Sequence, residues 1–222
     1  MPRRSRASTQ VRPPRQARSQ TTMERVLDAT LAILDGRDFE SIPLTEITEA
    51  ARISASSLWA RFPSKRGLLR ALHERHLARG RAMIDAVAEA ERQSPDDPGA
   101  VLSRVVRVFL ASRADTQGPA ATFRIAERRD PSFARRRHEL DMHVIRLLRD
   151  YLIDRLGVAD PQKRKQIDLA VWGVAMAIIA AVEPPYGFAE HVGVGHEEVA
   201  VELARMGKAY LDLVLASTLT PR

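Results

Sequence analysis

The sequence has no cysteine and few aromatic residues, and both shortages narrow the possible functions. Without cysteine among its 222 residues, the chain forms no disulfide, gives no thiolate to a metal ion and has no thiol nucleophile. Aromatic residues make up 5% of the chain, and runs that alternate between apolar and polar residues are absent. No stretch reaches the roughly 18 apolar residues of a membrane span, and the basic N-terminus lacks the apolar core of a secretory signal. We therefore expect a cytoplasmic protein without a membrane partner.

Positive charge is concentrated in the first third of the chain. Residues 1–80 carry 15 Lys and Arg against 8 Asp and Glu, whereas residues 81–222 carry 20 of each. Six arginines precede Glu24, the first acidic residue, and Pro, Ser, Thr and Gln separate them. This composition predicts a disordered basic arm over residues 1–18. Such an arm either attracts a polyanion, most simply the phosphates of nucleic acid, or only keeps the chain in solution.

Apolar residues recur at helical spacing through the rest of the chain, which predicts an all-α fold. A first helix is expected to begin at Thr21, which has capping-box spacing to Glu24, and to end at Gly36. A long amphipathic helix is expected to begin at Ser64 and to end in the turn at 94–99. Further helices are expected at about 100–114, 119–129, 131–156, 161–183 and 196–219, each bounded by Pro, Gly or Asp.

Residues 44–62 indicate two short helices joined by a tight turn. Leu58 and Phe62, four residues apart, are expected to face inward from the second helix, and Ser54 is its expected N-cap. The outward residues are small or able to hydrogen-bond, which suits a helix that enters the DNA major groove. They are Ala55, Ser56, Ser57, Trp59, Ala60 and Arg61. A helical hairpin inside a core is the plainer alternative.

The segment ITEAARISASSLWARFPSKRGLL resembles the signature of the TetR family of transcriptional regulators (AcrR-like), and Phe62-Pro63-Ser64-Lys65 followed by Leu68-Leu69 is its most specific part. The detailed resemblance covers about residues 21–72. It implies an N-terminal three-helix helix-turn-helix DNA-binding domain at 19–64, joined to a C-terminal helical ligand-binding and dimerisation domain at 65–222. It also implies a regulator without catalysis or cofactor, commonly a repressor that a small-molecule effector releases from DNA.

The resemblance further implies which residues touch DNA. Phosphates or base edges are contacted by Ser54, Ser56, Ser57 and Trp59 of the second helix and its cap. Trp59 stands where the family usually has Tyr. Lys65 matches a lysine that contacts the DNA backbone. Arg61 is the side chain best able to read guanine, and a phosphate contact is its alternative. Hydroxyl groups of threonines add phosphate contacts. The complete expected set is Thr21, Thr22, Thr45, Arg52, Ser54, Ala55, Ser56, Ser57, Trp59, Arg61 and Lys65.

Three residues depart from the family pattern. Arg52 stands where the family commonly has Gly at the turn, which predicts a left-handed backbone at a non-glycine residue and a possible phosphate contact from its side chain. Thr48 replaces a customary Ala. Pro43 replaces the usual Ser or Thr cap, which puts one backbone contact in doubt.

The neutral two thirds of the chain hold the expected dimer and effector sites. Residues 169–182 contain no charge, so we expect this segment to be buried nearly all round. With the last helix it suits a four-helix homodimer interface, although an intrachain core gives the same signals. A dimer would place two recognition helices about 34–36 Å apart on double-stranded operator DNA. Candidates for the effector pocket, which suit an ordinary core equally well, are Met83, Phe109, Phe123, Tyr151, Trp172 and Met176.

Other classes of function find less support. The basic cluster 124–138 suits an anionic effector, but a solvated face paired with nearby acids is the favoured interpretation. The segment 73–76 lacks HExxH spacing and the segment 193–195 lacks the third glycine of a dinucleotide site, so neither a metal ligand set nor a catalytic residue is predicted. An all-α ligand carrier or enzyme with a solubilising arm, or an architectural DNA-binding protein without an effector, remains open.

Overall fold

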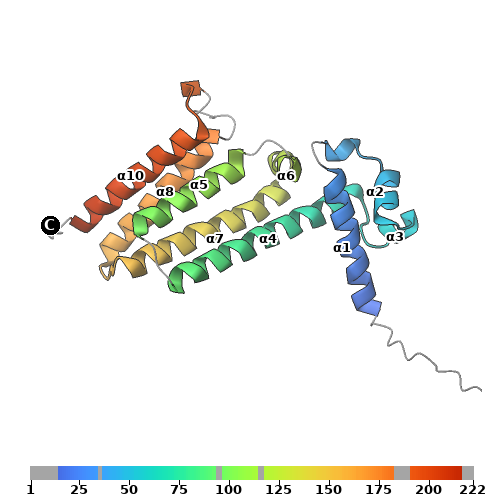
Figure 1. Cartoon of the computed structure of the whole chain (residues 1–222), viewed down its shortest axis with the longest axis horizontal. Helices are drawn as coiled ribbons and strands as arrows, with labels where there is room; N and C mark the ends of the chain where they lie inside the picture. The colour runs from blue at the N-terminus through green and yellow to red at the C-terminus, as the bar shows by residue number, and fades with distance from the viewer. Residues whose placement is uncertain (1–14, 35–36, 94–96, 115–117, 183–190, 217–222) are drawn as a thin grey trace, which may run out of the picture. The chain divides into compact units, whose positions relative to one another are not determined.

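The computed structural model describes residues 15–34, 37–93, 97–114, 118–182 and 191–216, and none of these forms a β-strand (Figure 1). The expected all-α fold is therefore confirmed. The chain divides into two compact units, residues 1–73 and residues 74–222. Residues 1–14 of the expected basic arm and Gly36 lie outside the described residues.

The first unit contains α1 (Arg15–Ile33), the 3-10 turn η1 (Phe39–Ser41), α2 (Leu44–Ala51), α3 (Ala55–Trp59) and the first turns of α4 (Lys65–Gln93). α1 packs on α2, and α2 packs on α3. Apolar side chains from every one of these elements form a core that water does not reach. Its members include Val26, Leu27, Leu34, Phe39, Ile42, Ile47, Leu58, Phe62, Leu68 and Leu72.

α1 begins at Arg15, six residues before the start that the capping-box spacing predicted. The prediction was wrong because Arg, Gln and Ala, which dominate residues 15–20, are themselves strong helix formers. Thr21 and Thr22 consequently lie inside the helix and do not cap it. α4 begins at Lys65, one residue after the predicted start at Ser64, and the Ser64 hydroxyl oxygen accepts a hydrogen bond from the Gly67 N–H at 3.0 Å.

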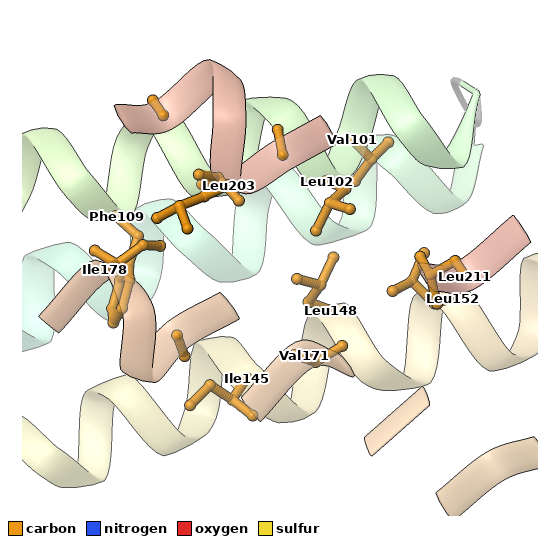
Figure 2. Close-up of a cluster of buried hydrophobic side chains, with 14 of the residues drawn as sticks. Val101, Leu102, Phe109, Ile145, Leu148, Leu152, Val171, Ile178, Leu203 and Leu211 are labelled. Atoms are coloured by element: carbon orange, nitrogen blue, oxygen red, sulfur yellow. The ribbon is translucent and has the colours of Figure 1, made fainter. Parts of the chain in front are cut away.

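The second unit contains the rest of α4 with α5 (Pro98–Ala114), α6 (Gly118–Arg129), α7 (Pro131–Arg155), α8 (Pro161–Val182) and α10 (His196–Ala216). These bounds lie within a few residues of the predicted ones, and residues 217–219 fall outside the described part. α10 packs against α5 and α8, while α7 contacts α5, α6 and α8. Figure 2 shows the core between them, with Leu102, Phe109, Leu148, Val171 and Leu203 turned toward one another.

One glycine allows three helices of this unit to approach closely. A Cβ atom at Gly207 of α10 would lie 3.1 Å from the side chain of Leu102 in α5 and 3.1 Å from that of Val174 in α8. Both distances are shorter than ordinary van der Waals contact, so the helix spacing depends on the missing side chain.

Polar contacts hold the second half of α4 within this unit. Arg81 donates to His143 Nδ1 of α7 at 3.3 Å, and His143 Nε2 lies 2.5 Å from Asp85 Oδ1. Nearer its end, α4 presents the buried Glu91 to Arg104 of α5 in an ion pair. α4 therefore begins in the first unit and is anchored by charged side chains in the second.

Candidate DNA-binding site

The turn between α2 and α3 has the geometry of a helix-turn-helix. Arg52 ends α2 with φ 51° and ψ 52°, which confirms the left-handed conformation predicted at this position. Its N–H donates to the Glu49 carbonyl at 3.0 Å, and the Ile53 N–H donates to the Thr48 carbonyl at 3.0 Å. Pro43, which precedes α2, provides no side-chain cap. The replacement of Ser or Thr at this position therefore leaves the start of α2 without a capping hydrogen bond from a side chain.

Ser54 organises the start of α3. Its hydroxyl oxygen accepts a hydrogen bond from the Ser57 N–H at 3.2 Å, as the N-cap prediction required. The same hydroxyl lies 3.0 Å from the hydroxyl oxygens of both Ser56 and Ser57. Three serines thus form a small hydroxyl cluster at the helix start.

α3 divides cleanly into a buried side and an exposed side. Leu58 and the following Phe62 are almost fully buried, which fixes the helix on the core of the first unit. Exposed side chains are those of Ser54, Ala55, Ser56, Trp59 and Ala60, and Ser57 is half-buried. Trp59 is the only large one among them, with 41% of its surface exposed. The exposed side of α3 thus carries small, uncharged side chains and one indole ring.

The Arg61 side chain turns back toward α3, which ends two residues before it. It is half-buried, and its Nη1 donates to the Ser57 carbonyl at 2.9 Å. Its Nε is buried among the described residues without a hydrogen-bond partner there. Arg61 therefore satisfies a carbonyl group at the end of α3, a use of its guanidinium that the sequence did not indicate.

Lys65 is also turned toward the protein. Its ammonium donates to the carbonyls of Glu40 at 2.6 Å and Ile42 at 2.8 Å, and it lies 5.3 Å from the centre of the Phe39 ring. Two of its three N–H donors therefore join α4 to η1, and one remains for another acceptor. Sequence reasoning missed this role because Glu40 and Ile42 contribute backbone atoms, which no residue pattern encodes.

An ion pair that no sequence pattern indicated holds the start of α2. Arg37 donates two hydrogen bonds to the Glu46 carboxylate, at 2.5 and 3.1 Å. These hydrogen bonds and the opposite charges lower the pKa of Glu46 and raise the pKa of Arg37. The two residues are nine apart, a spacing that matches neither helical nor strand periodicity.

The remaining expected DNA contacts lie on three different segments of the first unit. Thr21 is exposed and Thr22 half-buried in α1, Thr45 is exposed in the first turn of α2, and Arg52 is exposed at the turn. Each of these four residues is therefore exposed at least in part.

The second unit does not bring the six effector candidates together. Met83 lies exposed on α4, and Trp172 and Met176 lie exposed on α8. Phe109 and Phe123 are buried, and Tyr151 packs against the main core cluster. Phe109 also lines a small apolar cavity of about 20 Å³ between α5, α7 and α8.

The expectation that residues 169–182 are buried nearly all round is wrong for the single chain. Leu169, Trp172 and Met176 face solvent, and Leu169 is 67% exposed. The neighbouring α10 exposes Met206 and Tyr210 in the same way. Two adjacent helices therefore carry exposed apolar stripes, which is unusual for a surface that meets only water.

The arginines of residues 124–138 contact groups of the protein where the structure specifies their partners. Arg124 donates to the Ser112 carbonyl at 3.2 Å, and Arg136 pairs with Glu74 at 2.6 Å. Arg137 lies 3.2 Å from Asp141, one of the acids expected to pair with this cluster. Among the described residues no three His, Asp or Glu side chains gather in a metal-binding arrangement, and no helix there is long and apolar enough to span a membrane.

Comparisons with known proteins agree with this geometry. The family model of the bacterial regulatory proteins, tetR family, matches residues 26–72, which include α2, α3 and the start of α4. No curated protein matches the chain in sequence.

Solved structures extend the likeness to the fold of nearly the whole chain. RolR in complex with resorcinol aligns with a TM-score of 0.56 and 19% identity, over 94% of this chain and 99% of its own. A regulator from Mesorhizobium loti gives a TM-score of 0.62 and 16% identity, over 88% and 98%. One from Streptomyces coelicolor gives 0.52 and 22%, over 88% and 98%. The family model thus identifies residues 26–72 as similar to the DNA-binding domain of the tetR family, and the solved structures show that the chain as a whole shares their fold.

Proposed function

We propose that this protein is a homodimeric regulator that binds a specific operator in double-stranded DNA through α3. The observation that carries the proposal is the shape and chemistry of α3 itself. Ser54 caps it, Leu58 fixes it on the core, and its exposed side presents small and hydroxyl-bearing side chains around Trp59. A helix of this kind fits the roughly 12 Å width of the major groove, where base edges are open to hydrogen bonds and apolar contact.

The proposed contacts divide into those that position the protein and those that meet bases. Thr21, Thr22, Thr45 and Arg52 are at least partly exposed and are assigned to phosphates, together with the remaining N–H donor of Lys65. The residues of α3 that meet bases or nearby phosphates are Ser54, Ala55, Ser56, Ser57 and Trp59. The positive charge of residues 1–80 adds sequence-independent attraction.

The exposed apolar stripes of α8 and α10 are the proposed homodimer interface. A second copy of the chain supplies the same stripes, so that pairing buries Leu169, Trp172 and Met206 against apolar partners. Fully burying side chains of this size contributes about 1.5 to 3 kcal/mol each, before the costs of association. A dimer also explains why an uncharged segment of α8 is exposed in one chain.

The second unit is the proposed effector domain, and repression released by the effector is the proposed mode of control. The apolar cavity beside Phe109 marks where packing between α5, α7 and α8 is incomplete. Its small volume means that these helices move apart as a ligand enters. α4 is anchored in the same unit through Asp85 and Glu91, so such movement changes the preference between DNA-bound and free states. Resorcinol, the ligand of RolR, is a reasonable first probe.

A charge-insertion pair tests the proposal. Purified protein is mixed with fragments of the DNA upstream of its own gene, and binding is measured by footprinting at stated salt concentrations. Trp59→Glu places a negative charge on the DNA-facing side and is expected to weaken binding about a hundredfold, because like charges held together cost several kcal/mol. Met83→Glu adds the same charge to an exposed position of α4 and is expected to bind normally.

Two outcomes would contradict the proposal. Equal binding by both variants would show that α3 does not meet DNA. A wild-type protein that binds small molecules but no DNA would favour the ligand-carrier alternative, and DNA binding without sequence preference would favour an architectural protein.

A further inference from the structure

The exposed side of α3 lacks the side chains that usually read guanine. Arg and Lys recognise guanine by donating to its O6 and N7 atoms together. Residues 54–60 are all described, and none of them is ionisable. The basic residues that follow α3 are Arg61, two residues after its end, and Lys65, at the start of α4. Arg52, which precedes α3, is assigned above to a phosphate.

The guanidinium of Arg61 is already hydrogen-bonded to a backbone carbonyl of α3. Turning it toward a base would break its hydrogen bond to the Ser57 carbonyl and would withdraw its partly buried side chain from the protein. The bond also satisfies a carbonyl near the C-terminal end of α3, which has no intrahelical partner to replace the guanidinium. Recognition of guanine by Arg61 would thus cost α3 a hydrogen bond at its C-terminal end.

The ammonium of Lys65 is hydrogen-bonded to backbone carbonyls in and next to η1. Two of its three donors hold the Glu40 and Ile42 carbonyls, so only one is left. One donor is enough for a phosphate oxygen but does not reach O6 and N7 of guanine together. Lys65 therefore suits a positioning contact with the DNA backbone and not base recognition.

What remains on the reading side is one large apolar group among hydroxyls. A serine hydroxyl both donates and accepts, so the serines tolerate several bases. The Trp59 indole instead offers a broad apolar surface, and the only apolar group that a base pair presents in the major groove is the C5 methyl of thymine. Ala55 and Ala60 also expose methyl groups here, but Trp59 has the largest apolar surface on this side and is therefore the residue expected to discriminate most between bases.

We propose that α3 selects its operator through thymine C5 methyl groups that pack against Trp59, and not through guanine recognition by Arg61. The inference rests on the proposed DNA-binding function and specifies which feature of the DNA is recognised. Arg61 is a positioning residue that maintains the end of α3, and Trp59 determines specificity.

The test begins with selection of duplexes from a randomised pool by the full-length protein. In the selected duplex, each thymine is replaced by uracil, which removes only the methyl group, and affinity is measured by fluorescence anisotropy. At the position that contacts Trp59, we expect about fourfold weaker binding for each half-site changed, the effect of exposing one buried methyl. Replacing guanines by 7-deazaguanine, which lacks the N7 acceptor, is expected to leave affinity unchanged.

Protein variants assign the methyl effect to its residue. Trp59→Ala is expected to bind the thymine and uracil duplexes equally, whereas Arg61→Ala is expected to keep the fourfold difference even where its overall affinity or stability falls. Circular dichroism confirms that each variant is folded. A matched loss of the methyl effect in Arg61→Ala, or a strong 7-deazaguanine effect that Arg61→Ala removes, would overturn the inference.

The proposed function and this inference fail in different ways. If the protein enriches no duplex, DNA recognition itself is contradicted. If it enriches a duplex in which no uracil replacement changes affinity, sequence-specific binding stands and only the role of Trp59 is contradicted.

Discussion

Two exposed tryptophans, one in each unit, have nearly equal exposure and very different neighbours. Trp59 of α3 is 41% exposed and Trp172 of α8 is 37% exposed. On the helix surface, the neighbours of Trp59 are Ala55 and Ser56, four and three residues before it. Those of Trp172 are Leu169, three residues before it, and Met176, four after it. Exposure alone therefore does not identify a partner.

The difference between these surroundings indicates two kinds of partner. An indole among hydroxyls can meet a surface that is itself polar, such as the edges of base pairs, without leaving polar groups unsatisfied. An indole among larger apolar side chains gains most from another apolar surface, such as a second copy of the same helix. Four predictions, in decreasing order of expected effect, test the apolar stripes of the second unit and the contacts that hold the first.

The largest effect is expected from a charge in the apolar stripes. Met206→Glu should separate the dimer, because a carboxylate buried at the interface would lose its hydration without gaining a partner. Mass measured by light scattering should fall to that of one chain, and affinity for a two-half-site operator should fall at least about a hundredfold, since that loss corresponds to several kcal/mol.

Val108→Glu is the matched control for the dimer prediction. Val108 is 55% exposed on α5, comparable to the 64% exposure of Met206, but it lies outside the α8 and α10 stripes. The variant should remain a dimer. Dissociation by both variants would show that the exposed apolar side chains of α8 and α10 have no special role.

The next effect concerns the stability of the first unit. Lys65→Met keeps the length of the side chain but removes the hydrogen bonds to Glu40 and Ile42. We expect the free energy of unfolding to fall by about 2 kcal/mol, the range for hydrogen bonds from a charged group. Denaturation followed by circular dichroism measures it. Lys163→Met, which removes one exposed contact to the Leu215 carbonyl, should change little by comparison.

A smaller change in the opposite direction is expected at the turn. Arg52→Gly should raise the free energy of unfolding by about 1 kcal/mol, because glycine adopts the left-handed conformation without the steric cost of a Cβ atom. Arg52→Ala retains that cost and should leave stability nearly unchanged. Both variants should lose the same proposed phosphate contact and thus bind DNA equally weakly. Equal stability of the two would contradict the argument from backbone strain.

The smallest effect depends on pH. The Glu46 pKa is lowered in the folded protein, so its pair with Arg37 stabilises the fold fully above the ordinary pKa of a glutamate. This contribution is lost as the pH falls through the lowered value. Wild type should therefore exceed Glu46→Gln in stability at pH 7, and the difference should vanish in acid. Urea midpoints measured across this range test the sign, and a difference that grows toward low pH would refute it.

Local chemistry explains which features could be predicted from the sequence. The Ser54 cap, the left-handed Arg52 and the buried Leu58 all follow from residues close in the chain, and all three were predicted. The same patterns gave the helices of the second unit to within a few residues, because Pro, Gly and Asp mark their ends.

Features that join distant segments could not be predicted. The Lys65 contacts use backbone carbonyls 25 and 23 residues away. The Arg61 contact is local, since Ser57 is four residues away, but its acceptor is a backbone atom that no residue pattern encodes. In the second unit an aromatic or apolar residue is compatible with a core, a pocket or an interface. Phe109 and Met176 illustrate this, since the first is buried and the second exposed.

Gly207 links the interior of the second unit to its proposed interface. Gly207 has no side-chain carbon at the point where α10 packs against both α5 and α8. A larger side chain there would push α10 away from these two helices. Tilting α10 against α8 would change how the stripes of two copies meet, and with it the distance between their recognition helices. In the proposed dimer, the operator spacing would therefore depend partly on Gly207, a residue buried inside each chain.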